Sequence, residues 1–309
     1  MRCFTIIILL LTGGICQAQL VYPNITVLYD SACTYQNLQL IPVVYKGPAG
    51  SGASTFINTI SLKTALKTGL VTVQERGSTA IENVHWLSLI NNSDKNIYIT
   101  SGEVMAGGRQ DRMVTKDTLI KARSGRVDLP VMCVEEGRWS EKDKKFTYSK
   151  MANSHLRKVL DQTKSQVLVW REINNQLNLQ NIQSKTLAYL AREKDKKYLL
   201  RIAAYVNFFT TKFSVADSSY VGFIAISGNT VLGSDIFITP NLFYGQFSSL
   251  LPGYIDEAIG FGSSPQLSHQ QIASKVDAFL KTEAAQAEYV IKHGKQFKIN
   301  QQVIHLTTY

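Results

Sequence analysis

The spacing of apolar residues changes near Trp139, and this change constrains the fold more than any other feature. Before Trp139 the apolar residues come in short runs bounded by turn formers, which is typical of β-strands. After it they recur at intervals of three and four residues, which is typical of amphipathic helices. The order predicts an α+β fold: an N-terminal, mostly antiparallel β-sheet, as a sandwich or open barrel, followed by long amphipathic helices and a C-terminal hairpin.

The N-terminal half is predicted to contain one short helix, over 61–68, among its strands. The expected strands are 38–46, 70–75, 84–90, 97–101, 109–115 and 127–135, with a short apolar piece at 118–120. Turn formers at 91–94 predict that 84–90 and 97–101 form a hairpin. The Gly-rich stretch 47–54 lacks the Lys-Ser or Lys-Thr pair of a phosphate loop, so we expect a flexible connector there.

The C-terminal half is predicted to alternate between helices and strands. Long helices are expected over 149–177, 186–210 and 268–291, and Pro240 should begin another. Strands 221–227 and 230–237 flank a glycine turn and predict a hairpin, and 297–306 predicts a closing strand. Because no Pro- or Gly-rich linker divides the halves, we expect a single α+β domain over 38–309, preceded by an N-terminal extension over 19–37.

Residues 1–18 have the pattern of an export signal peptide. Arg2 precedes an apolar run at 4–11, and small residues lead to a cleavage site after Ala18. The apolar run is shorter than the ~20 residues that a membrane helix needs. We therefore expect an exported protein, periplasmic or secreted, that is not inserted into a membrane.

Composition predicts neither nucleic-acid binding nor a metal or cofactor site. The formal net charge is +10, but the basic residues are spread out rather than gathered with aromatics on one stripe. The five histidines are scattered, with no His-x-x-x-His or Cys-x-x-Cys pair. Two cysteines follow the expected cleavage site, Cys33 and Cys133. Both a disulfide and buried free thiols are compatible with their positions.

Two polar motifs, at 102–112 and 133–139, interrupt the β-like sequence, where charge is costly unless it is paired or used. Arginines at these positions would hold phosphate or carboxylate through two N–H groups, glutamates would accept from hydroxyl groups, and the tryptophan would stack on a ring. The candidate ligand-binding residues are Glu103, Gly107, Gly108, Arg109, Gln110, Arg112, Glu135, Arg138 and Trp139.

Alternation along a strand predicts how the two motifs meet. If 109–115 is a strand, Gln110 and Arg112 share one face and would contact one glutamate of the second motif, whereas Arg109 would contact the other. The adjacent Gly107 and Gly108 indicate a bulge or a close approach of the backbone to another group.

Three functions fit these motifs. The favoured one is a binding domain for a small anionic or polar ligand derived from phosphate, a nucleotide or a sugar. The second is a hydrolase of a glycosidic or phosphoester bond that uses Glu103 and Glu135, whose carboxyl groups would then lie ~5–9.5 Å apart. The third is a structural or interaction module in which the motifs form a buried ion-pair network.

The motifs resemble the signature of the ARG and rhodanese-phosphatase-superfamily-associated protein domain. The resemblance rests on Gly102-Glu103, 107–112 and 131–139, and the stretch 221–237 is similar to the C-terminal part of that family. It covers roughly 38–291. The family has no characterised function, and its name records an association with ADP-ribosylglycohydrolases and phosphatase-like proteins. The resemblance therefore implies ADP-ribose or phosphorylated ligands.

Overall fold

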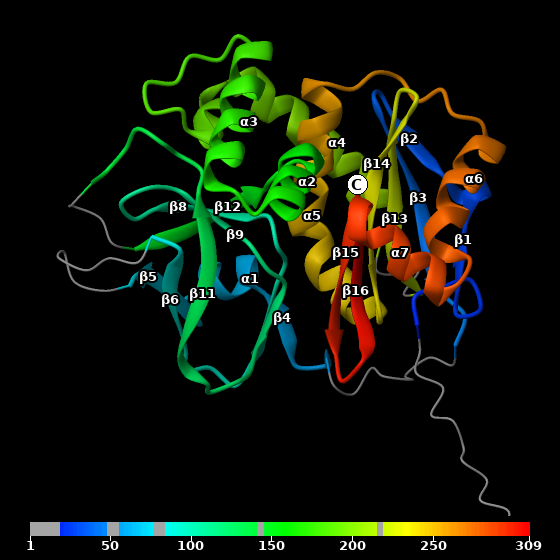
Figure 1. Ribbon diagram of the computed structural model, residues 1–309, viewed down its shortest axis with the longest axis horizontal. Coiled ribbons are helices and arrows are strands. Elements are labelled where there is room, and N and C mark those ends of the chain that lie inside the picture. Colours follow the sequence, from blue (N-terminus) through cyan, green and yellow to red (C-terminus); the bar gives the residue numbers. More distant parts are fainter. Residues whose placement is uncertain (1–18, 48–55, 77–83, 141–144, 215–218) are drawn as a thin grey trace, which may run out of the picture.

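The computed structural model describes residues 19–47, 56–76, 84–140, 145–214 and 219–309. Two lobes lie side by side, with helix α5 (Pro240–Gly260) between them (Figure 1). The first lobe is built on a sheet from the N-terminal half, and the second on a sheet that combines strands from both ends of the chain. The fold is α+β with mostly antiparallel sheets, as predicted. That the two lobes form a single domain over 38–309 stays a prediction.

The first lobe contains two sheets among the described residues. The larger has the order β12-β8-β9-β11-β6-β5, and all its neighbouring strands are antiparallel. Its strands are β5 (Val71–Glu75), β6 (Trp86–Asn91), β8 (Glu103–Gly107), β9 (Arg112–Val114), β11 (Gly125–Cys133) and β12 (Phe146–Met151). The smaller consists of β4 (Thr59–Ser61), β7 (Asn96–Ile99) and β10 (Thr118–Ile120), with β4 and β7 parallel. Helix α1 (Leu62–Lys67) follows β4 directly and begins where the Ser61 side chain accepts a backbone N–H.

The second lobe is built on seven strands within the described residues, in the order β1-β3-β13-β14-β16-β15, with β2 also paired to β3. These strands are β1 (Ile25–Val27), β2 (Cys33–Tyr35), β3 (Leu38–Tyr45), β13 (Tyr220–Ser227), β14 (Thr230–Phe237), β15 (Gly294–Ile299) and β16 (Gln302–Thr308). The N-terminal extension thus contributes β1 and β2 to this sheet. The predicted strand at 38–46 and the hairpin at 221–237 are confirmed.

Helix α5 is buried along almost its whole length because it packs against both lobes. It packs on β13 and β14 of the second lobe and on β12 and β4 of the first. The helix begins at Pro240, as predicted, and Thr239 caps its N-terminus. The residues of α5 that face the strands are therefore shared by both lobes.

Each predicted long helix is two shorter elements, so those three predictions were wrong in extent. The first is α2 (Ser154–Thr163) and α3 (Gln166–Leu179), the second is a 3-10 turn (Tyr189–Lys194) and α4 (Lys196–Lys212), and the third is α6 (His269–Leu280) and α7 (Glu283–His293). At each break Ser165, Asp195 or Thr282 accepts a backbone N–H and begins a new helix. The apolar spacing continued across these caps, which hid the breaks. Residues 146–151, partly assigned to the first helix, form β12 instead.

Three strand predictions were also wrong. Strand β6 pairs with β5 and β11, whereas β7 pairs with β4 and β10, so the predicted hairpin is split between two sheets. The Asn91 amide donates to the carbonyls of Lys95 and Lys121, and these bonds hold residues 91–95 in a turn that does not pair β6 with β7. Of 109–115 only β9 is a strand. The predicted closing strand is the hairpin β15–β16, which turns at Asn300 and Gln301 with positive φ angles.

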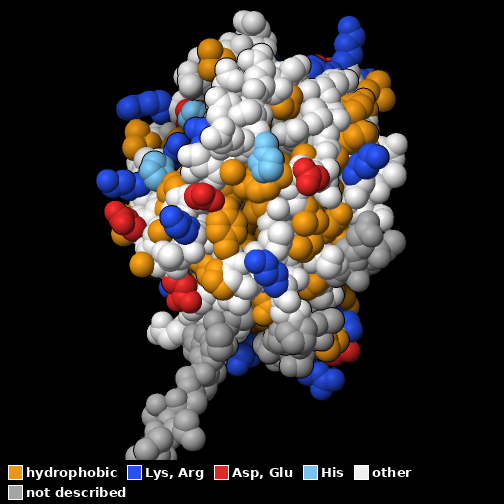
Figure 2. Space-filling view, turned by 90° about the vertical axis from the view of Figure 1, so that its right-hand side faces the viewer, with side chains coloured by type: hydrophobic (Ala, Val, Ile, Leu, Met, Phe, Trp, Pro, Cys, Tyr) orange, Lys and Arg blue, Asp and Glu red, His pale blue; other side chains and the backbone are white. Residues whose placement is uncertain are grey.

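Cys33 and Cys133 are both free thiols, one on β2 and the other at the end of β11. Within the described residues no helix combines the length and the apolar character needed to cross a bilayer. The predicted signal peptide at 1–18 lies outside the described residues, as do all but the first residue of the predicted Gly-rich connector. On the outer face of the second lobe, around α6 and α7, apolar side chains are interspersed with charges of both signs (Figure 2).

Candidate functional site

The two polar motifs lie side by side in the first lobe, as predicted. Met105 on β8 pairs with Arg112 on β9, and Arg112 pairs in turn with Cys133 on β11. The turn between β8 and β9 therefore faces the segment that follows β11, and the backbone N–H of Val134 donates to the carbonyl of Asp111 across the gap.

Arg138 holds this turn closed through four of its five N–H groups. Its Nε donates to Glu135 Oε2 at 2.6 Å and its NH1 to the carbonyl of Gly108 at 2.8 Å. Its NH2 donates to the carbonyl of Gly107 at 3.2 Å and to Asp111 Oδ1 at 2.9 Å. The Arg138 side chain is 29% exposed, so one edge of it reaches solvent. Its charge is already balanced by two carboxylates.

The turn needs glycine at both 107 and 108. Their φ angles are +115° and +53°, in the region that side chains disfavour. A Cβ on Gly107 would lie 2.5 Å from the carbonyl oxygen of Lys145. The predicted close approach is thus an approach of one backbone segment to another.

Arg112 is fully buried and contacts a carboxylate that lies outside both motifs. Its NH2 is 3.6 Å from Oε1 of Glu75 on β5, and its NH1 donates to the carbonyl and the side chain of Gln110, both at 3.2 Å. Gln110 donates to the backbone carbonyls of Glu135 and Glu136 rather than to their side chains. The predicted pairing was wrong because β9 begins only at Arg112, so the residues before it do not alternate as in a strand.

Arg109 and Trp139 form a stacked pair at the surface of this cluster. Arg109 is buried, and its Cζ lies 5.0 Å from the centroid of the Trp139 ring, which is 50% exposed. Such a cation–π contact contributes ~0.5–2 kcal/mol. The Arg109 backbone N–H also donates to Glu75, at 2.8 Å. We call the ion-paired residues Glu75, Asp111, Arg112, Glu135 and Arg138 the motif clamp.

Glu103 lies apart from the motif clamp. Burial raises its pKa to about 8 and outweighs the lowering by the Thr100 hydrogen bond and by the charges of Lys63 and Arg157. Its Oε2 accepts the backbone N–H of Thr100 at 3.3 Å, and its Oε1 has no hydrogen-bond partner among the described residues. The charged groups that influence it are Asp117, Lys63 and Arg157, not the arginines of the motifs.

Glu103 and Glu135 are too far apart to act as a catalytic pair. Met105, Arg112 and Cys133 form one row across three strands, and Glu103 and Glu135 lie two residues to opposite sides of that row. At 3.2–3.4 Å per residue the separation along the strands is ~13 Å. This exceeds the ~5–9.5 Å of glycosidase carboxylates.

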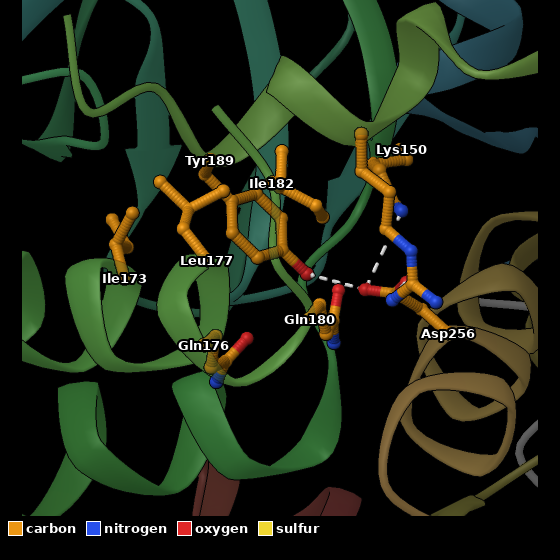
Figure 3. A pocket seen from close by; sticks show the side chains of 9 residues that line it. Lys150, Ile173, Gln176, Leu177, Gln180, Ile182, Tyr189 and Asp256 are labelled. Carbon is orange, nitrogen blue, oxygen red and sulfur yellow. Dashed lines mark hydrogen bonds and ion pairs between the residues drawn. The ribbon is translucent and has the colours of Figure 1, made fainter. Parts of the chain in front are cut away.

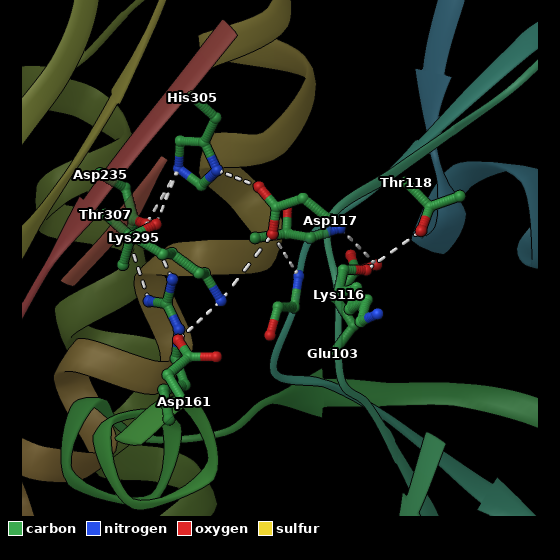
Figure 4. A network of polar contacts seen from close by, with 12 residues as sticks. Glu103, Lys116, Asp117, Thr118, Asp161, Asp235, Lys295, His305 and Thr307 are labelled. Carbon is green, nitrogen blue, oxygen red and sulfur yellow. Dashed lines mark hydrogen bonds and ion pairs between the residues drawn. The ribbon is translucent and has the colours of Figure 1, made fainter. Parts of the chain in front are cut away.

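A second charged cluster, not predicted from the sequence, lies between the lobes (Figure 4). His305 on β16 contacts Asp117 through Nδ1 at 2.5 Å and Asp235 on β14 through Nε2 at 3.0 Å. Arg157 on α2 donates two hydrogen bonds to Asp235, at 2.9 and 2.8 Å. Lys295 on β15 lies 3.9 Å from the Asp117 carboxylate.

The cluster continues from Lys295 to Asp161 on α2, at 2.7 Å. We call this run of alternating charges the charge chain. It consists of Asp161, Lys295, Asp117, His305, Asp235 and Arg157.

Both nitrogens of His305 face carboxylates, which favours the doubly protonated ring. Burial alone would lower the pKa of His305, but Asp117 and Asp235 outweigh it and raise the pKa. Burial would likewise raise the pKa of Asp235, yet Arg157 and His305 hold it well below its usual range. One sequence signal was available: Asp235 and His305 are isolated charged or titratable residues within otherwise apolar strands.

The comparison with known protein families agrees with these motifs. The model of the ARG and Rhodanese-Phosphatase-superfamily-associated Protein domain matches residues 26–308. The chain belongs to this family. The match extends the predicted range at both ends, to include β1 and β16, so the family domain takes in both lobes. No curated protein or solved structure matches the chain significantly.

In this member of the family a third polar cluster surrounds Asp256 on α5 (Figure 3). Asp256 accepts from Arg192 at 3.0 Å and from the hydroxyls of Tyr198 and Tyr189 at 2.5 and 3.0 Å, and Lys150 lies 3.5 Å away. The cavity beside it measures about 10 Å³, which suits one water molecule. This cluster is a structural contact between the lobes. Among the described residues no three His, Cys, Asp or Glu side chains gather to hold a metal ion.

Proposed function

We propose that the protein is a binding domain for a small polar ligand whose ring stacks on Trp139. The observation that carries the proposal is the half-exposed indole, held in place by the buried guanidinium of Arg109. An exposed aromatic face fixed on a rigid turn offers a planar or sugar ring a large contact at little cost in side-chain entropy.

The motif arginines support this platform rather than grip an anion. Arg109 and Arg112 are buried, and four of the five N–H groups of Arg138 are engaged. The two arginines of the motif clamp face three carboxylates, so they offer an incoming phosphate no uncompensated positive charge. The remaining N–H of Arg138 would provide one polar contact. A nucleotide or sugar derivative therefore fits better than phosphate alone.

A hydrolase that uses Glu103 and Glu135 is not favoured, because these residues lie at opposite ends of the paired strands. A purely structural role accounts for the motif clamp but not for the exposed Trp139. Binding without catalysis by this pair is the function that the geometry supports best.

The test is titration of the protein with ADP-ribose, nucleotides and sugars. Binding is monitored through tryptophan fluorescence and through the melting temperature. Trp139→Ala should weaken binding roughly 5- to 150-fold, which corresponds to the ~1–3 kcal/mol that stacking contributes. Leu179→Ala, at another exposed apolar position, is the control and should bind as the wild type does. Inorganic phosphate alone should give no shift. A panel without a single binder, or unchanged binding by Trp139→Ala, would favour the structural module.

We also propose that the protein is exported, because residues 1–18 have the pattern of a signal peptide. Mass spectrometry of the protein from its native cells would test this. The exported fraction should begin at Gln19, and a full-length chain retained in the cytoplasm would contradict the proposal.

A further inference from the structure

A cleft of about 130 Å³ opens at the beginning of α2, where the two lobes meet. Its wall includes Ser154, His155 and Lys158 from α2, Thr230 from β14 and Glu257 from α5. Ligand sites occur preferentially where two structural units meet. The cleft is separate from the Trp139 platform and shares no residue with it.

Glu257 is a buried acid without a cation. It is 7% exposed, and its Oε2 accepts the backbone N–H of His155 at 3.2 Å. Within the described residues no side-chain nitrogen of Lys, Arg or His lies within 4.0 Å of its carboxylate. The adjacent Asp256, by contrast, has both Arg192 and Lys150 within that distance.

The pKa values of the two neighbouring acids follow this difference. Burial, with Asp256 and Glu172 adding to it, raises the pKa of Glu257 to about 7. Burial would raise the pKa of Asp256 too, but Lys150 and Arg192 lower it. Two adjacent carboxyl groups with opposite shifts, one of them at a cleft, are typical of functional sites.

The opposite charge of the cleft is provided by Lys158. It lies one helical turn after Ser154 on the same face of α2 and is half-buried. Among the described residues no ion pair joins Lys158 to Glu257, because their charged atoms lie more than 4.0 Å apart. The cleft therefore presents a carboxyl group and a lysine ammonium group that do not form an ion pair with each other.

We infer that this cleft binds a small zwitterion of the amino-acid class, with its ammonium group at Glu257 and its carboxylate at Lys158. A ligand ammonium would compensate the buried carboxylate, which is costly to leave alone. The volume is below the ~300 Å³ at which pockets for drug-sized ligands begin, which suits an amino acid.

Calorimetric titration of the whole protein with free amino acids tests this inference, at a pH about one unit above the pKa of Glu257. The panel includes the matching amines without a carboxylate and the matching carboxylic acids without an ammonium group. At least one amino acid should bind, and its two single-charge analogues should bind at least ~10-fold more weakly, or ~1.4 kcal/mol.

Two variants separate recognition from folding. Glu257→Gln and Lys158→Met should each weaken amino-acid binding at least ~10-fold. Because Glu257→Gln removes a buried charge that has no cation, its melting temperature should not fall. Lys185→Met, at an exposed lysine outside the cleft, should bind as the wild type does. No binding by any amino acid, equal binding by a single-charge analogue, or wild-type affinity in both cleft variants would overturn the inference.

Discussion

The motif clamp and the charge chain are both buried ion networks, but they are built in different ways. Most of the motif clamp comes from one turn and the segment beside it, and its Arg138 is partly open to water. The charge chain takes its residues from α2, β14, β15, β16 and the loop before β10, and all of its ion-paired groups except Lys295 are almost completely buried.

This difference shows that a high density of charged residues in the sequence identifies an ion network only when its residues are neighbours in the chain. The motif clamp appears as a dense polar motif because its residues are neighbours in the chain. The charge chain joins the two lobes, so each element contributes one or two charged residues and no stretch is conspicuous. Solvent can replace a lost partner in the motif clamp, but it cannot reach the centre of the charge chain.

The largest effect should follow removal of the cation at the end of the charge chain. Arg157→Met leaves Asp235 with His305 as its one ion-pair partner among the described residues, beside the hydroxyls of Tyr254 and Thr307, and should cost ~3–5 kcal/mol of unfolding free energy. Urea denaturation measures it. The control is Arg76→Ala, which breaks a surface pair with Asp128 whose side chains are 44% and 42% exposed, and should cost less than ~1 kcal/mol. Equal costs in the two variants would show that the charge chain is not a stabilising contact.

Glu103 lies beside the charge chain and should affect stability in a pH-dependent way. Its pKa is raised to about 8 in the fold, so the folded protein holds its proton more tightly than the unfolded chain, with a pKa of ~4.3. Stability should therefore fall as pH rises between these values. Glu103→Gln cannot lose that proton and should be up to ~5 kcal/mol more stable than the wild type above pH ~8, with little difference near pH ~4.

The measurement is unfolding free energy against pH for the wild type and Glu103→Gln. His305 also has a raised pKa, so its contribution is complete below ~6.5 and is lost as pH rises through the folded value. That loss occurs in both proteins, and the difference between the two curves isolates Glu103. Parallel curves would rule out the raised pKa of Glu103.

A smaller loss is expected when the motif clamp is opened. Arg138→Met removes four hydrogen bonds and leaves Glu135 and Asp111 facing each other. Because the site is partly exposed, water can solvate both carboxylates, and we expect a cost of ~1–3 kcal/mol. Urea denaturation of Arg138→Met and Arg157→Met in parallel tests which network contributes more to stability. A larger loss of unfolding free energy in Arg138→Met would show that the motif clamp contributes more than the charge chain.

Local patterns predicted most of the fold, and the errors have a common cause. Strand β3, helix α1 and the β13–β14 hairpin were predicted because each depends on its own residues. The helix breaks at Ser165, Asp195 and Thr282 were missed because a capping side chain acts through one hydrogen bond, which the apolar spacing does not record. The partners of β6 and β7 depend on which strands lie next to them, which no local pattern contains.

The candidate site divides in the same way. The proximity of the two motifs was predicted, and the structure brings Arg138, Glu135 and the glycine turn together. The contact between Arg112 and Glu75 was missed because Glu75 lies on a strand far upstream in the sequence. Glu103 was assigned to the site because it lies within the first motif in sequence, although the charged groups near its side chain are Asp117, Lys63 and Arg157.

The pairing of β3 with β13 has a consequence for how the protein is made. The chain emerges from the ribosome starting at its N-terminus, and β13 begins 220 − 45 = 175 residues after β3 ends. Until β13 has been synthesised, one edge of β3 has no native partner, and such edges attract strands of other chains. Correct assembly of this sheet therefore depends on protection of an early strand during synthesis, and His305 can join the charge chain only when the last strand arrives.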